Sequence, residues 1–175
     1  YPGIGDAVYD ETFIVPTKGN FMQTICRDWE DEARKIENKG VCSVSIRTGV
    51  VLGLGGMLEK LLPLFKLGLG GSVGDGKQWL PWIHIEDLVS VFIAAALDDR
   101  YQGPVNAVSP NPVPYQEFSS TLGKVLHRPT FLTTPAFILK LVLGEAAALA
   151  LNSYRINPAK LVQSYDFHFR FTQLS

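Results

Sequence analysis

The run from residue 41 to residue 52 most constrains how this chain can fold. It is rich in valine and isoleucine, and it is too uniformly apolar for a strand that keeps one face in water. Strands of this kind are typical of parallel sheets that carry helices on both faces. The run therefore predicts a buried parallel strand in an α/β fold.

Helical patterns lie on both sides of this strand. Between residues 20 and 39 apolar side chains recur at helical spacing, with Asn20 as a candidate N-cap and Gly40 beyond the end. A second helical pattern covers residues 85–97, and residues 104–109 follow it as a short strand. This alternation predicts parallel strands joined by right-handed crossovers.

Three further segments have patterns of their own. The glycine-rich stretch 53–76 surrounds apolar residues 57–67, which predicts a turn, a brief helix and a loop of the kind that covers ligands. After residue 110, repeated prolines predict short helices with no parallel strand between them. Near the end, phenylalanines at 167, 169 and 171 alternate with other residues, which indicates a short strand or an extended packing arm.

Composition excludes several classes of protein. Sixteen Lys and Arg against 17 Asp and Glu leave a net charge of -1, so we expect neither nucleic acid nor an anionic membrane surface as a partner. The two cysteines, Cys26 and Cys42, belong to no cluster with zinc-ligand spacing, which predicts no metal site and a reducing compartment. The longest apolar stretch, 136–151, is interrupted by charges and is shorter than the roughly 20 residues that cross a bilayer.

The sequence starts at Tyr1, with neither an initiator methionine nor a signal-like apolar segment. This start is typical of a chain cut from a longer one. We expect a cytoplasmic protein, or one of the mitochondrial matrix if a targeting segment lies upstream.

Two motifs carry a family resemblance. Residues 78–89, QWLPWIHIEDLV, resemble the segment written RDYIHVxDLA in many extended short-chain dehydrogenases/reductases. Residues 47–53, RTGVVLG, are similar in position and spacing to the R-x-F-N-x-x-G strand end of the same family. Each motif also has a purely structural interpretation, in which Asp87 caps the next helix, His84 is a satisfied core histidine and Gly49 is a packing residue.

The wider resemblance points to one atypical subgroup. The blocks GNF…CRDWE, LGLGGSVG and GPVNAVSPNPV, with the tail 135–174, are similar to NAD(P)-dependent epimerase/dehydratase-like proteins known as epimerase family proteins. The resemblance covers nearly the whole chain. It implies the carboxy-terminal part of a Rossmann-like doubly wound parallel sheet with a small, mostly helical cap region. We accordingly expect residues 1–110 to form an incomplete Rossmann-like core, with a glycine-rich substrate loop at 53–78, and residues 111–175 to form the cap or tail.

The resemblance also implies a cofactor and a substrate. NADP(H), or alternatively NAD, would lie with its nicotinamide against Thr48, Gly49 and Val50, at the strand end where ligands collect in open α/β sheets. A small organic substrate would be bordered by four residues: Gln78, Trp79, Trp82 and His84. Two tryptophans suit a flat or lipophilic molecule, although both could instead pack under the loop.

The chain departs from the family pattern at the catalytic positions. The family's Y-x-x-x-K dyad falls on Met22 and Cys26, neither of which can act as the acid/base or its lysine partner. Tyr1 is the remaining candidate catalytic residue, as a remnant of a tyrosine pair in the subgroup, but Gly5 stands where a lysine would help it.

Two ligand-binding features of the family are absent as well. Val50 and Leu80 replace the asparagine and arginine that hold nucleotide sugars in classical sugar epimerases. The sequence contains no G-x-G-x-x-G turn for a pyrophosphate, so we expect no cofactor binding by these 175 residues alone.

Three functional hypotheses follow. In the first, the intact protein is an NADP(H)-dependent oxidoreductase or epimerase-like protein acting on an unknown small molecule. In the second, it binds the cofactor without turnover, as a sensor or interaction protein. In the third, the stretch 136–151 docks against a partner chain and the protein forms a homo-oligomer.

Overall fold

The computed structural model describes residues 1–3, 5–14, 21–133, 137–138, 141 and 151–174. Most of the apolar stretch 136–151, and the proposed N-cap Asn20, lie outside these residues. No helix in the described part of the chain is long and apolar enough to cross a membrane.

Helices and strands alternate through the first two thirds of the chain. The helices are α1 (Phe21–Arg34), α2 (Gly56–Lys66), α3 (Ile85–Leu97) and α4 (Tyr115–Leu126), with a 3-10 helix at Lys35–Lys39 and a π-helical turn at Lys160–Ser164. The strands are β1 (Val8–Tyr9), β2 (Val44–Thr48), β3 (Val50–Leu52), β4 (Trp79–Leu80), β5 (Trp82–His84), β6 (Gly103–Ala107), β7 (Val113–Pro114) and β8 (Arg155–Ile156).

The predicted strand 41–52 consists of two strands that pair with different partners. β2 is parallel to β6, and β3 is parallel to β5. The change of partner occurs at Gly49, whose N–H donates to Ala107 O at 3.3 Å, while Val50 N–H donates to Pro81 O at 2.7 Å. The prediction of parallel strands is confirmed, but burial of the whole run is wrong, because β2 is half-buried with Thr48 exposed.

Helix α3 has the predicted bounds, and its start is capped by the preceding residue. The ring of His84 accepts a hydrogen bond from Glu86 N–H at its Nδ1. The predicted helix 20–39 is α1 followed by the 3-10 helix, and Gly40 ends it with a positive φ of 76°. Only glycine adopts this backbone conformation without a steric penalty, so Gly40 is a helix terminator, as the sequence predicts.

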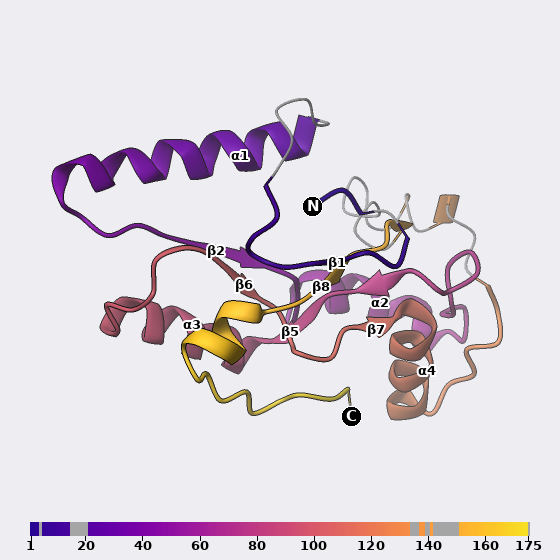
Figure 1. The fold of residues 1–175 in the computed structure, drawn as a ribbon. Coiled ribbons are helices and arrows are strands. Elements are labelled where there is room, and N and C mark those ends of the chain that lie inside the picture. The colour runs from indigo at the N-terminus through magenta and orange to yellow at the C-terminus, as the bar shows by residue number, and fades with distance from the viewer. Residues whose placement is uncertain (4, 15–20, 134–136, 139–140, 142–150, 175) are drawn as a thin grey trace.

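The chain after residue 110 crosses back to the first part. β7 pairs antiparallel with β4, and β8 pairs parallel with β1, so the expectation of no parallel strand in this region is wrong. Figure 1 shows the carboxy-terminal segment returning beneath α3. The boundary proposed at residue 110 stays a prediction.

Two hydrophobic clusters hold these elements together. One joins α2, α4 and the strands β3 to β5 around Leu61, Phe65 and Trp82, and the other joins α3 and β6 around Ile83, Val91 and Val105. By contrast, α1 has no buried residue and stands away from the other helices (Figure 1). Its apolar side chains Phe21, Met22 and Trp29 are all exposed.

Candidate cofactor and substrate site

Members of the two predicted groups of site residues lie on the neighbouring strands β3 and β5. In the parallel pair of β3 and β5, Val50 is opposite Trp82 and Leu52 is opposite His84. This register brings the proposed nicotinamide-side segment and part of the proposed substrate border to one place in the fold. Sequence reasoning could identify each segment, but only the pairing shows that they are adjacent.

Gly49 is required by the neighbouring backbone. A Cβ atom at this position would lie 2.6 Å from Pro81 O and 2.9 Å from Val108 Cγ1, closer than side-chain atoms approach such neighbours. The packing role considered for Gly49 is therefore present. The space that a side chain would occupy is filled by Pro81 and Val108, so this packing role accounts for the glycine without a ligand. Contact with a nicotinamide stays a prediction.

Trp82 and His84 are both held by the protein itself. Trp82 is only 2% exposed, and its indole Nε1 donates to Asn111 O at 3.0 Å. His84 caps α3 through Nδ1 and stacks on Phe171, with 3.8 Å between ring centroids. Neither placement tests a substrate role, but the burial of Trp82 leaves it little surface for one.

Gln78 and Trp79 lie farther along the same segment and connect distant parts of the chain. The Trp79 indole donates to Asp6 Oδ1 at 2.8 Å, and the guanidinium of Arg155 lies 4.3 Å from its ring. The amide side chain of Gln78 donates to Val73 O at 3.1 Å, inside the glycine-rich loop. These contacts make the segment a junction between the amino-terminal arm, the loop and the tail.

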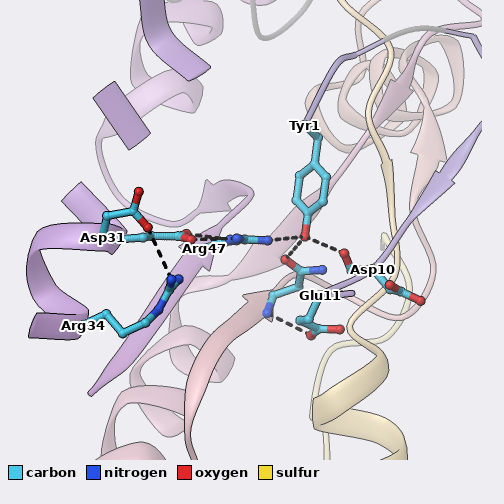
Figure 2. Close-up of polar contacts among 8 residues, drawn as sticks. Tyr1, Asp10, Glu11, Asp31, Arg34 and Arg47 are labelled. Carbon is cyan, nitrogen blue, oxygen red and sulfur yellow. Dashed lines mark hydrogen bonds and ion pairs between the residues drawn. The ribbon is translucent and has the colours of Figure 1, made fainter. Parts of the chain in front are cut away.

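The Tyr1 phenol is the centre of a polar cluster beside β2 and β6 (Figure 2). Its oxygen accepts a hydrogen bond from Arg47 at 3.0 Å, and its single O–H is shared between two acceptors, Asn106 Oδ1 at 2.6 Å and Asp10 O at 3.0 Å. Burial raises the pKa of this phenol, although the hydrogen bond and charge of Arg47 act in the opposite direction. The phenol is therefore neutral at pH 7 and fully engaged in hydrogen bonds.

Arg47 and Glu30 form the least exposed ion pair among the described residues. Two guanidinium nitrogens donate to the two carboxylate oxygens at 2.6 and 2.7 Å, a bidentate geometry. Their side chains are only 20% and 17% exposed. Donating these hydrogen bonds to Glu30 raises the pKa of Arg47 above its ordinary value. The pair attaches α1 to β2.

Sequence reasoning did not assign a role to three buried or half-buried polar residues in this region. Arg47 is the charged residue of the half-buried strand β2, which is a signal that it has a partner. Glu11 is buried and accepts hydrogen bonds from Asn106 N–H at 2.9 Å and from Lys160 N–H at 3.3 Å. Nothing in the local sequence around Glu11 or Asn106 predicts this pairing, because the residues are 95 positions apart.

The dyad positions of the family lie on the exposed helix α1. Met22 is 63% exposed, and Cys26 is also exposed. No group of three potential metal ligands occurs in the part of the chain that the structure describes. The glycine-rich stretch 68–76 leads from α2 into β4 and not from a strand into a helix, so it does not provide the turn that binds a pyrophosphate.

Comparison with known proteins shows that this chain is similar to epimerase family proteins. The carboxy-terminal residues 134–175 match a domain of unknown function, DUF1731. A chloroplastic epimerase family protein SDR39U1 homolog from Arabidopsis thaliana is 38% identical over 168 residues, which cover 95% of this chain and 48% of the relative. The chain spans about half the length of the curated relatives it matches.

Two solved structures share the fold. Human epimerase family protein SDR39U1, crystallised with NADPH, superposes with a TM-score of 0.86 at 32% identity, covering 97% of this chain and 57% of the other. A nucleoside-diphosphate sugar epimerase from Corynebacterium glutamicum superposes with a TM-score of 0.77 at 34% identity, covering 97% and 32%. These similarities confirm the predicted Rossmann-like α/β class.

Proposed function

Because this chain belongs to the epimerase family proteins of the extended short-chain dehydrogenase/reductase superfamily, we propose that the protein binds NADP(H) and acts on a small organic substrate. The observation that carries the proposal is the parallel pairing of β3 with β5, which brings the segment of Thr48, Gly49 and Val50 beside the strand that ends in His84. A cofactor at the first strand would then face a substrate bordered by the second.

The residues present suit the nicotinamide end of the cofactor and not its pyrophosphate. Thr48 is exposed, and Gly49 carries no side chain at the point where the strand changes partner. The pyrophosphate needs backbone amides at a helix amino terminus, and the sequence lacks the G-x-G-x-x-G turn that supplies them. That half of the binding site would have to come from residues outside this chain.

When bound, the cofactor would supply hydride chemistry, while the protein would orient the substrate. The ring of His84 caps α3 and stacks on Phe171, so it would give the substrate border a fixed wall, and the buried indole of Trp82 supports the strand. Preference for NADP(H) over NAD is proposed from the human relative, which was crystallised with NADPH.

Titration of the full-length protein with NADPH, followed by the cofactor's fluorescence, tests the proposal. We expect saturable binding that Thr48→Leu weakens at least about tenfold, since a bulky side chain at the strand end would obstruct the ring. The matched control is Thr133→Leu, another exposed threonine, which should bind like the wild type. Absence of saturable binding by the wild type, or equal affinities for the two variants, would contradict the assigned site.

A second candidate is cofactor binding without turnover. It is favoured by the exposed Met22 and Cys26 at the dyad positions and by the Tyr1 phenol, whose hydrogen bonds to Arg47, Asn106 and Asp10 occupy it fully. A phenol held in this way is a structural group and a poor acid/base. Oxidation of NADPH measured across a panel of carbonyl compounds separates the two candidates, because steady turnover of any panel member excludes this second one.

A further inference from the structure

We propose that a cavity between the glycine-rich loop and α4 binds a small neutral molecule rich in hydroxyl groups, such as a monosaccharide or a cyclitol. The cavity has a volume of about 390 Å³. It is lined by Ser72, Gln116, Ser119, Ser120, Thr130 and Phe131. The cavity lies beside α4. The proposal does not depend on cofactor binding.

The first support is a buried hydroxyl group without a partner. Ser119 is 1% exposed, and its Oγ is the buried side-chain polar atom that finds no hydrogen-bond partner among the described residues. Leaving a buried polar group unpaired destabilises the folded state, so such groups nearly always meet a partner. Since Ser119 lines the cavity, a molecule inside the cavity would supply that partner.

The second support is the way in which the cavity walls are built. At Gly71 a Cβ atom would collide with Leu132 O, and at Gly123 it would collide with Thr130 Cγ2. The segment after α4 can therefore fold over the loop and the helix only because both positions are glycine. These two close approaches fix Thr130 and its neighbour Phe131 at the mouth of the cavity.

A third glycine fixes the opposite wall. A Cβ atom at Gly76 would lie 2.9 Å from Gln116 Cβ and 3.0 Å from Ser72 Cβ. Gly76 also has a φ of 70°, which side-chain-bearing residues seldom adopt. The close approach brings the loop residue Ser72 beside Gln116 on α4, so the polar groups of the cavity are held in place by the fold.

The lining selects a neutral ligand. The described lining residues carry no charge, and the first two amides of α4 are already used: Tyr115 N–H donates to Gln78 O and Gln116 N–H to Gly76 O, both at 2.9 Å. Among these described lining residues an anion would find no cation, and two of the amides at the start of α4 are already bonded. Hydroxyl and amide side chains each donate and accept, and this matches a molecule whose hydroxyl groups do the same.

The size and the rim of the cavity agree with a monosaccharide or cyclitol as the ligand. Small-molecule sites measure roughly 300–1,000 Å³, and this cavity is near the lower end. Phe131 is exposed and lines the cavity, where its flat face offers an apolar surface to the ring of a sugar or cyclitol. One aromatic side chain beside several hydroxyl groups suits a ring with one apolar face and a polar edge.

Ligand-observed NMR with the full-length protein tests the inference, with D-glucose and myo-inositol as probes and inorganic phosphate as the charged comparison. We expect saturable binding of at least one neutral probe and none of phosphate. Ser119→Ala should weaken binding at least about tenfold, because it removes one hydrogen bond at almost unchanged volume. The matched control is Ser90→Ala, which removes a half-buried helical serine hydroxyl on α3 that donates to Glu86 O and lies outside the cavity lining.

The melting temperature of each variant completes the design. If Ser119 lacks a protein partner, Ser119→Ala should melt at or above the wild-type temperature, whereas a loss of stability would show that the hydroxyl is already satisfied within the protein. The inference is overturned by that loss, by the failure of both neutral probes to bind, by preferential binding of phosphate, or by equal probe affinity of Ser119→Ala and the wild type.

Discussion

Asp87 fastens the carboxy-terminal arm to the start of α3, and its removal should release the arm. The carboxylate is 1% exposed, and its two oxygens accept hydrogen bonds from the N–H groups of Arg170 and Phe171 at 2.9 and 3.0 Å. No other hydrogen bond of the described residues joins the backbone of these two positions to the body of the protein. Asp87→Ala should therefore free two amides at once.

The size of the effect follows from the charge of the acceptor. Hydrogen bonds to charged groups contribute about 1.5–3 kcal/mol each, and two that share one carboxylate are not fully additive. We expect Asp87→Ala to lower the free energy of unfolding by about 3 kcal/mol. Part of the loss should appear as local opening of the arm, because Phe171 would also lose its anchored stacking on His84.

Hydrogen exchange of the Arg170 and Phe171 amides is the direct assay. A local loss of about 3 kcal/mol corresponds to exchange that is roughly 100-fold faster. The control is the neighbouring Glu86→Gln, which breaks the exposed ion pair with Arg170 and should cost no more than about 1 kcal/mol. If Asp87→Ala exchanged no faster than this control, the carboxylate would not be the anchor of the arm.

Three further predictions concern other parts of the molecule. Arg47→Met should lower the free energy of unfolding by about 2 kcal/mol in urea titrations, because it leaves the half-buried carboxylate of Glu30 unpaired, whereas Lys35→Met, which breaks an exposed pair, should have little effect. Burial raises the pKa of Tyr115 to about 12, so between pH 10 and 12 the folded state keeps a proton that the unfolded state loses. The stability present below pH 10 should therefore fall by about 1.4 kcal/mol per pH unit in that window, and equal slopes for the wild type and Tyr115→Phe would refute this cause. Produced alone, the 175-residue chain should self-associate in analytical ultracentrifugation and should not bind NADPH, since α1 has no buried residue and the pyrophosphate turn is missing; a folded monomer with micromolar affinity would contradict it.

Local pattern was enough to predict several elements. The apolar periodicity of residues 85–97 gives α3 its bounds, and glycine at position 40 ends the preceding helical segment, because both depend on interactions within a few residues. The family motifs likewise identified the two segments of the candidate site, residues 47–53 and 78–89. For such features the sequence alone is sufficient.

Pairing between distant segments had to come from the tertiary structure. The strand predicted at 41–52 divides at Gly49 because Pro81, which is remote in sequence, approaches its Cα and supplies the next hydrogen-bond acceptor. The buried position of Trp82 follows from packing between β5 and its neighbours, and alternation along a strand of three residues could not reveal it.

The role of the motif around residue 87 shows the same limit. The sequence left open whether Asp87 caps α3, and the structure gives the cap to His84 while the carboxylate binds the tail. The phenylalanine alternation at 167–171 is compatible with a strand or an arm; it is an arm because two of its amides meet a buried carboxylate and not the edge of a strand. Sequence determined which residues are apolar or charged, whereas tertiary structure decided which of them meet, because each such contact joins residues that are far apart along the chain.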